Sequence, residues 1–420
     1  MKYNRTEIAE NIGYSTIIDK KFKTCTISVR FLTMLDKNTA AANSLAVSEL
    51  SSTNSTYRTI ASMNEKLSAL YGASLASSTR KRGDVQVLSV GASWITNKYT
   101  FDSEDVDGEM LSVFRDCIFS PETEDGAFGA DTFTINQKDL LDRIDAEIND
   151  KRSYALARAA EVAFRGENAA NSCYGTKESA GAVTASSAYE AYLRLLRTAQ
   201  IEIFFVSPEE KPEAERIFRD GFAQITREPE PCTFRSKSPV KTEVAESSDT
   251  FDVRQCKMVL SYKTDTEDRF GLKMMSVMLG ELPVSKLFMN VREKLSLCYY
   301  CTCRSNFSKG AFMIDSGVEK DNIEKAKAEI QRQIEDMCSG NFTDKDIENA
   351  VLALTNGLRS VGDTPWSYIG WCFEGFCGGE LLTPQQMDER YREVTRERII
   401  AAAKSLSPDS VYIMFGKEAE

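Results

Sequence analysis

Apolar residues in the first half of the chain recur at two kinds of spacing, which predict strands and helices in mixed order. Within residues 23–34, Ile27, Val29 and Phe31 alternate with the residues between them, and this predicts a strand with one strongly apolar face. Other segments follow the same two rules. The pattern predicts further strands at 73–80, 85–95 and 201–206, and helices at 39–50, 60–70, 109–118, 131–165 and 186–197.

The second half repeats this order of elements. Residues 65–68 and 293–296 both read EKLS, and in each copy a predicted helix ends and a predicted strand begins there. An internal duplication explains the repeat. The pattern predicts strands at 255–262, 298–305, 310–318 and 411–415, and helices at 265–279, 284–291, 321–338, 343–359, 366–376 and from 383 onward.

The two halves meet in a polar segment that contains three of the ten prolines, EPEPCTFRSKSPV at 228–240. We therefore expect an N-terminal domain over 1–226, a linker over 227–240 and a C-terminal domain over 241–420. Strands that follow one another without an intervening helix indicate mostly antiparallel pairing. The expected class is α+β, with two homologous domains that each hold a sheet covered by helices.

Charge and composition exclude several classes of partner. The formal net charge is −11 and the longest basic run is Arg80–Arg82, so a nucleic-acid partner is not expected. No stretch of 18 uncharged apolar residues occurs, and the first residues are polar, so no membrane association is expected. The eleven cysteines, scattered through apolar segments, fit buried, reduced thiols. We expect a soluble, cytoplasmic protein.

One cysteine cluster has a spacing reminiscent of a metal site: Cys298, Cys301 and Cys303. A structural zinc needs four ligands, and strand alternation would place Cys298 on the opposite face from the other two. A cysteine nucleophile is also disfavoured, because the chain contains no histidine to serve as its base. These thiols are therefore expected to pack in a core.

Two longer stretches carry a family resemblance. LGELPVSKLFMNVREKLSLCYY at 279–300 resembles the second-domain signature of the insulinase/pitrilysin family of zinc peptidases, which includes the mitochondrial processing peptidase subunits. NSCYGTKESAGAVTASSAYEAYLRLLRTAQIEIFFV at 171–206 resembles the segment before the end of the family's first domain. Together with the duplicated layout, the resemblance covers nearly the whole chain. It implies the mitochondrial processing peptidase-like fold.

The resemblance also implies that the zinc site has been lost. The family's H-x-x-E-H motif is set against SLAVS, so that Ser44 and Ser48 stand at the histidine positions and Val47 at the general base. Glu147 could lie near the distal ligand, but we expect a glutamate on a helix surface. This chain is expected to bind no cofactor, and the zinc is expected in a partner subunit.

The second-domain motif, by contrast, is present. Arg292 and Tyr299 fall on the family positions that contact the substrate peptide and help to stabilise the oxyanion. Alternatively, Arg292 could cap a helix C-terminus and Tyr299 could be a half-buried strand residue. Tyr300 is expected to point to the other face of the strand and to serve in packing.

The resemblance implies the non-catalytic, substrate-binding subunit of a heterodimeric zinc metalloendopeptidase, with a homologous zinc-bearing subunit as partner and peptides as substrates. The alternative is a non-enzymatic peptide-binding or scaffold protein with the peptidase fold. Hydrolysis by this chain alone is disfavoured, since it would need a cysteine or a carboxylate-bound metal.

Overall fold

The computed structural model describes residues 2–101 and 104–416, and the chain forms two compact units. Unit 1 holds the chain up to Asp145, with Asn171–Thr233 and Gly362–Gly379. Unit 2 holds Ala146–Ala170, Phe234–Val361 and the chain from Glu380 onward. Each unit thus takes one segment from the other half of the sequence. The expected contiguous domains, 1–226 and 241–420, assign each of these two segments to the opposite half.

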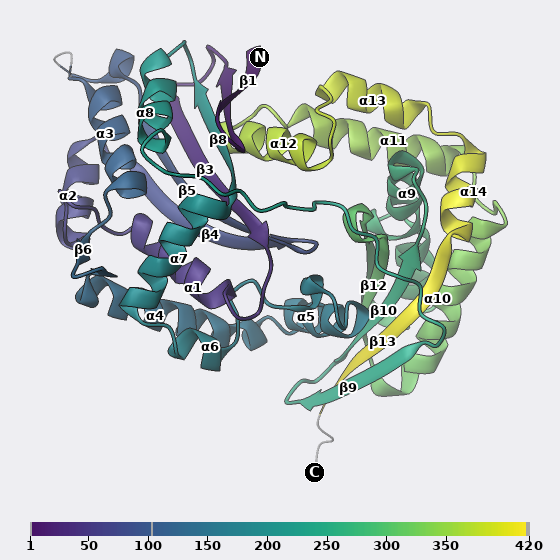
Figure 1. The fold of residues 1–420 in the computed structure, drawn as a ribbon. Coiled ribbons are helices and arrows are strands. Elements are labelled where there is room, and N and C mark those ends of the chain that lie inside the picture. Colours follow the sequence, from purple (N-terminus) through teal and green to yellow (C-terminus); the bar gives the residue numbers. More distant parts are fainter. Residues whose placement is uncertain (1, 102–103, 417–420) are drawn as a thin grey trace. The chain divides into compact units, whose positions relative to one another are not determined.

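Unit 1 is built on a six-stranded sheet (Figure 1). Neighbouring strands pair in antiparallel fashion except β2 and β8, which are parallel. The central strands are rich in β-branched and aromatic residues, as expected for a buried sheet. The strand order is β1 (Lys2–Ala9), β2 (Ile12–Ile18), β8 (Gln200–Ser207), β3 (Thr24–Met34), β5 (Val85–Ile95) and β4 (Ser74–Arg82).

Helices from the first half of the sequence enclose the main core of unit 1, in which residues of β3 and β5 pack with those of α1, α3 and α7. The opposite face of β3 and β8 contacts α12, which comes from the second half of the sequence (Figure 1). The helices are α1 (Ala40–Leu50), α2 (Ile60–Ala69), α3 (Val106–Phe119), α4 (Ala130–Ala146), α6 (Lys177–Gly181), α7 (Ala185–Thr198), α8 (Pro212–Phe222) and α12 (Pro365–Cys377).

Unit 2 is built on a five-stranded sheet that repeats this topology. Its order is β11 (Cys298–Asn306), β12 (Ala311–Val318), β10 (Cys256–Thr264), β13 (Leu406–Gly416) and β9 (Ala245–Phe251), with only β13 and β9 parallel. The helical elements are α5 (Lys151–Ala163), α9 (Arg269–Ser276), α10 (Ile323–Cys338), α11 (Asp344–Arg359), α13 (Pro384–Arg392), α14 (Arg396–Lys404) and two π-helical segments, η4 (Val277–Glu281) and η5 (Leu287–Lys294).

The two sheets support the internal duplication. The order β4-β5-β3-β8-β2 in unit 1 corresponds strand for strand to β11-β12-β10-β13-β9 in unit 2, including the position of the parallel pair. Helix α5 packs on β10 and β13, and α12 packs on the corresponding strands β3 and β8. The predicted class, α+β with two mostly antiparallel sheets, is therefore confirmed.

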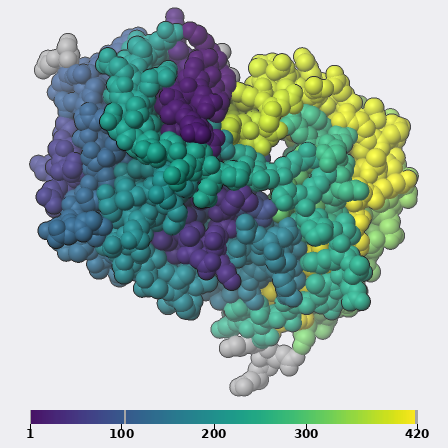
Figure 2. All heavy atoms as spheres, in the orientation of Figure 1, coloured from purple at the N-terminus to yellow at the C-terminus, as the bar shows by residue number. Residues whose placement is uncertain are grey.

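Some elements differ from the sequence prediction. The predicted helix at 131–165 is two helices, because Asp150 accepts hydrogen bonds from the amides of Arg152 and Ser153 and so begins α5 anew. Strands β1, β2 and β9 and helix α8 were not predicted. Figure 2 shows β1, in purple, at the surface of unit 1 beside the teal residues of α8. Within residues 2–101 and 104–416, no helix is long and apolar enough to cross a membrane.

Candidate functional site in unit 2

Arg292 lies in the last turn of η5, on the solvent side. Its guanidinium stacks on the ring of Phe288, one turn earlier, at 4.6 Å from the ring centroid. Glu293 forms only a long contact with it, 3.4 Å from Nε, and 42% of the Arg292 side chain is exposed. Ser296 then ends the helix in a left-handed conformation (φ 52°), so that its amide bonds to the Arg292 carbonyl. The contact with Phe288 thus positions the Arg292 side chain, while the N–H donors of its guanidinium remain accessible.

Tyr299 follows at the start of β11, which is an edge strand of the unit 2 sheet. Cys298 pairs with Val318 and Tyr300 with Gly317, so Tyr299 is the extra residue of a β-bulge. The bulge turns its side chain outward, and Tyr299 is 64% exposed. A half-buried packing role for Tyr299 is therefore wrong.

Its neighbour Tyr300 behaves differently. The ring of Tyr300 is half-buried, and the guanidinium of Arg152 from α5 lies 4.4 Å from its centroid. Burial and the nearby Asp315 carboxylate raise the pKa of the Tyr300 phenol. Of the two adjacent tyrosines, Tyr299 is therefore the more accessible to an outside group.

The same bulge overturns the prediction for Cys298. Because it shifts the alternation by one residue, Cys298 lies buried with Cys301 and Cys303 instead of on the opposite face. A hydrogen bond from Cys301 lowers the pKa of the Cys298 thiol, and burial raises the pKa of Cys303. In the part of the chain that the structure describes, no group of three or more cysteine or acidic side chains could hold a metal ion.

The positions of the degenerate zinc motif lie on α1, inside unit 1. The Ser44 hydroxyl donates to Thr79 Oγ1 of β4 at 2.8 Å, and the Ser48 hydroxyl donates to the Ser44 carbonyl at 3.1 Å. Val47 is 1% exposed and packs in the core. Neutral hydroxyls that already donate to protein oxygens and a core valine do not fit a zinc ion. Glu147, in the exposed 3₁₀ turn Glu147–Asn149, lies in the other unit.

A buried carboxylate directly after these positions escaped the sequence reasoning. Glu49 is 2% exposed, and Asn136 of α4 donates to its Oε1 at 2.8 Å. Burial raises the pKa of Glu49 to about 7. The hydrogen bond from Asn136 opposes this rise in pKa, and the negative charge of Glu122 adds to it. The signal in the sequence is weak: a single acid in the small and apolar stretch AAANSLAVSEL.

Glu49 gives a testable pH dependence. Its pKa in the folded chain lies above the unfolded value, so the cost of ionising it accumulates as the pH rises from about 4.5 to about 7. We expect Glu49→Gln to raise the free energy of unfolding by about 2 kcal/mol at pH 8 and by clearly less at pH 5.5. Denaturant unfolding at both pH values measures this. The exposed Glu65→Gln is the control, and an equal gain at both pH values for Glu49→Gln would contradict the assignment.

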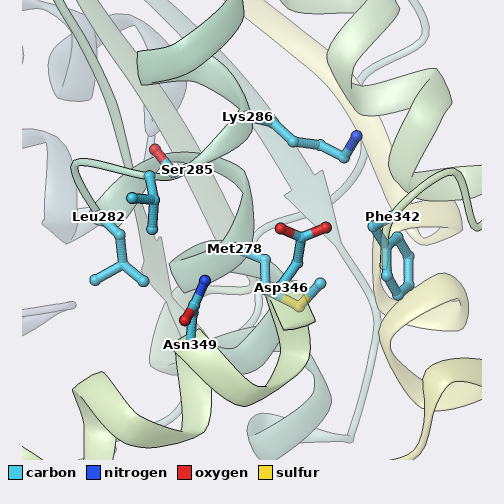
Figure 3. Close-up of a pocket in the computed structure, with 8 residues that line it drawn as sticks. Met278, Leu282, Ser285, Lys286, Phe342, Asp346 and Asn349 are labelled. Carbon is cyan, nitrogen blue, oxygen red and sulfur yellow. The ribbon is translucent and has the colours of Figure 1, made fainter. Parts of the chain in front are cut away.

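A small pocket lies between η4, the start of η5 and α11 in unit 2 (Figure 3). Arg292 and Tyr299 do not line it, so it is not part of the candidate site. Its residues are Met278, Leu282, Val284, Ser285, Lys286, Phe342, Asp346 and Asn349.

Comparisons with known proteins show two similarities in sequence. The family model described as the peptidase M16 inactive domain matches residues 182–354. A Bacillus subtilis protein named "Probable inactive metalloprotease YmfF" is 25% identical over 403 residues, 95% of this chain and 94% of that protein.

Solved structures share the fold over the whole chain. A conserved protein from Enterococcus faecalis superposes with a TM-score of 0.92 at 24% identity, and each chain is covered completely. A peptidase M16 inactive domain from Pseudomonas fluorescens superposes with a TM-score of 0.80 at 15% identity, again over both whole chains.

The class of protein follows from these findings: the chain has a peptidase fold and lacks the residues of a zinc peptidase's metal site. More particularly, it is similar in sequence to the peptidase M16 inactive domain over residues 182–354 and to the Bacillus subtilis protein over nearly its whole length, and its sequence contains no H-x-x-E-H motif.

Proposed function

We propose that this chain is the non-catalytic, substrate-binding subunit of a cytoplasmic, heterodimeric zinc metalloendopeptidase. A homologous partner subunit carries the zinc and the water-activating glutamate. This chain supplies Arg292 and Tyr299 to the partner's site and helps to hold the peptide. The guanidinium fork and the phenol are donors for the carbonyl oxygen that becomes negatively charged during attack on the peptide bond.

One observation carries the proposal: the two side chains that the family uses on substrate are exposed, whereas two of the three positions of its zinc motif, Ser44 and Val47, are buried. Exposure of Tyr299 requires the bulge in β11, and a plain strand would place that residue differently. On α1, Ser44 and Val47 are buried, so that neither can reach a substrate or a metal. This pattern fits a subunit that contributes to a site without owning its metal.

The direct test is to mix this chain with a homologue that carries an intact H-x-x-E-H motif, taken from the same organism. We expect hydrolysis of an unfolded peptide to be slow for either protein alone and at least tenfold faster for the mixture. A mixture no faster than the zinc-bearing protein alone would rule the shared site out. In that case the non-enzymatic peptide-binding role remains, which predicts peptide binding without hydrolysis.

A further inference from the structure

An arginine in unit 1 lacks the partner that a buried guanidinium normally has. Arg30 lies on β3 and points to the face of the sheet that α12 covers. Its guanidinium stacks on Phe373 of α12, 4.2 Å from the ring centroid, and lies 5.4 Å from the centroid of Phe204 of β8. Its Nε is buried without a hydrogen-bond partner, and among residues 2–101 and 104–416 no carboxylate pairs with it.

The acids near Arg30 are already engaged. Glu202, opposite Arg30 in the sheet register, forms a two-bond pair with Arg5. Glu374 of α12 pairs with Arg82 at 3.2 Å. Desolvation lowers the pKa of Arg30 to about 10, and the charge of Arg80 adds to this effect. Neither of these two carboxylates is therefore free to neutralise Arg30.

Polar groups on the neighbouring strands complete an open surface. Ser89 of β5 lies directly opposite Arg30, and Ser78 of β4 lies directly opposite Ser89, so all three share one face. Arg80, two residues beyond Ser78, belongs to the same face. Ser78 and Arg80 are exposed and Ser89 is half-buried. Two arginines and two serines thus lie on one face of the sheet, and the exposure of their side chains increases from β3 towards the edge strand β4.

We propose that this face binds a carboxylate group of a peptide, held by the planar fork of Arg30 with help from Arg80, Ser78 and Ser89. The guanidinium lies over the ring of Phe373, with the perpendicular ring of Phe204 beside it, and these contacts hold it in place while its two Nη atoms are left for paired hydrogen bonds to a carboxylate. The carboxylate belongs to the C-terminus of the peptide or to an acidic side chain. The inference deepens the proposed function, in which the chain holds a peptide, and it rests on that role.

The test uses the full chain alone and three acetylated nonapeptides of alanine, serine and tyrosine, measured by calorimetric titration. The first has a free C-terminus, the second a C-terminal amide, and the third an amide with one central glutamate. We expect the peptide with the C-terminal amide and no glutamate to bind at least tenfold more weakly than one of the other two peptides. Tight binding of the peptide with the free C-terminus identifies a C-terminal carboxylate as the ligand, and tight binding of the glutamate peptide identifies an acidic side chain. Equal dissociation constants for all three, or no binding of any, would overturn the proposal.

Variants identify the residues. Arg30→Gln should abolish the preference for a carboxylate, Arg30→Lys should retain part of it, and Arg80→Gln should weaken it. Arg115→Gln is the matched control, since that arginine is exposed on α3, on the opposite face of the sheet, and should leave the preference intact. An unchanged preference in both Arg30→Gln and Arg80→Gln would contradict the site.

The assay is independent of any partner subunit. If the mixture with the zinc-bearing homologue hydrolyses peptides but the carboxylate preference is absent, only this inference fails. If the preference is present and the mixture is inactive, the shared zinc site fails instead.

Discussion

Arg292→Ala is expected to lower the turnover of the mixed peptidase by about 10² to 10³-fold, the usual cost of removing one donor to an oxyanion. The effect should fall on kcat more than on KM, because the interaction strengthens as negative charge develops on the carbonyl oxygen. Stability should change little, since Arg292 is exposed and, within residues 2–101 and 104–416, its only ionic contact is with its neighbour Glu293. Steady-state hydrolysis of a fluorogenic peptide by the mixture measures both constants.

Two matched controls come from the same segment. Lys294 is an exposed cation two residues further along η5, and Lys294→Ala should leave turnover unchanged. Tyr299→Phe should reduce turnover, whereas Tyr300→Phe should not, because the Tyr300 ring is covered by Arg152. If Arg292→Ala and Lys294→Ala have equal effects, the loss reflects general surface charge, and Arg292 has no specific role at the scissile bond.

The sequence predicted the strands in which apolar and polar side chains alternate clearly. It did not predict the strands that are held in the sheet mainly by backbone hydrogen bonds. The central strand β3 and its counterpart β10 show their apolar faces in the sequence. Strands β1 and β9 carry polar residues, such as Arg5 and Glu246, and sit at sheet edges, where backbone pairing holds them without an apolar face. The partner of β9, β13, lies far away in the sequence, whereas β1 pairs with β2 directly after it, and neither edge strand shows an apolar alternation that predicts it.

The exchange of α5 and α12 between the units could not be predicted for a related reason. An amphipathic pattern shows that a helix has an apolar face, but not which sheet covers that face. At the candidate site, the exposure of Tyr299 and the burial of Cys298 depend on a one-residue bulge that the family motif does not reveal. Simple alternation gave the wrong face for Cys298 because it assumes an unbroken strand.

Strand β1 also holds an ion pair whose loss should destabilise unit 1 strongly. Arg5 donates from Nε and Nη2 to the carboxylate of Glu202 on β8, at 3.0 and 2.6 Å, and the Glu202 side chain is 0% exposed. Gly13, on the strand between them, leaves the space for both groups, because a Cβ there would collide with each. Phe376 of α12 covers the guanidinium, 5.3 Å from its ring centroid.

We expect Arg5→Ala to lower the free energy of unfolding by about 3 kcal/mol at pH 7, because it leaves a buried carboxylate without a counter-charge. Burial already raises the pKa of Glu202, and Arg5 opposes that rise. The loss of unfolding free energy should therefore grow as the pH increases above about 4.3. Above that pH, Glu202 ionises in the unfolded chain but stays protonated to a higher pH in the folded variant. Chemical denaturation of the variant between pH 5 and pH 8 measures this dependence.

Two further variants serve as controls. Adding Glu202→Gln to Arg5→Ala should recover much of the loss in the free energy of unfolding. Lys2→Ala, which breaks an exposed ion pair on the same strand, should leave the unfolding midpoint almost unchanged. A loss that is independent of pH and persists in the double variant would show that Arg5 acts through packing on Phe376 and not through its charge.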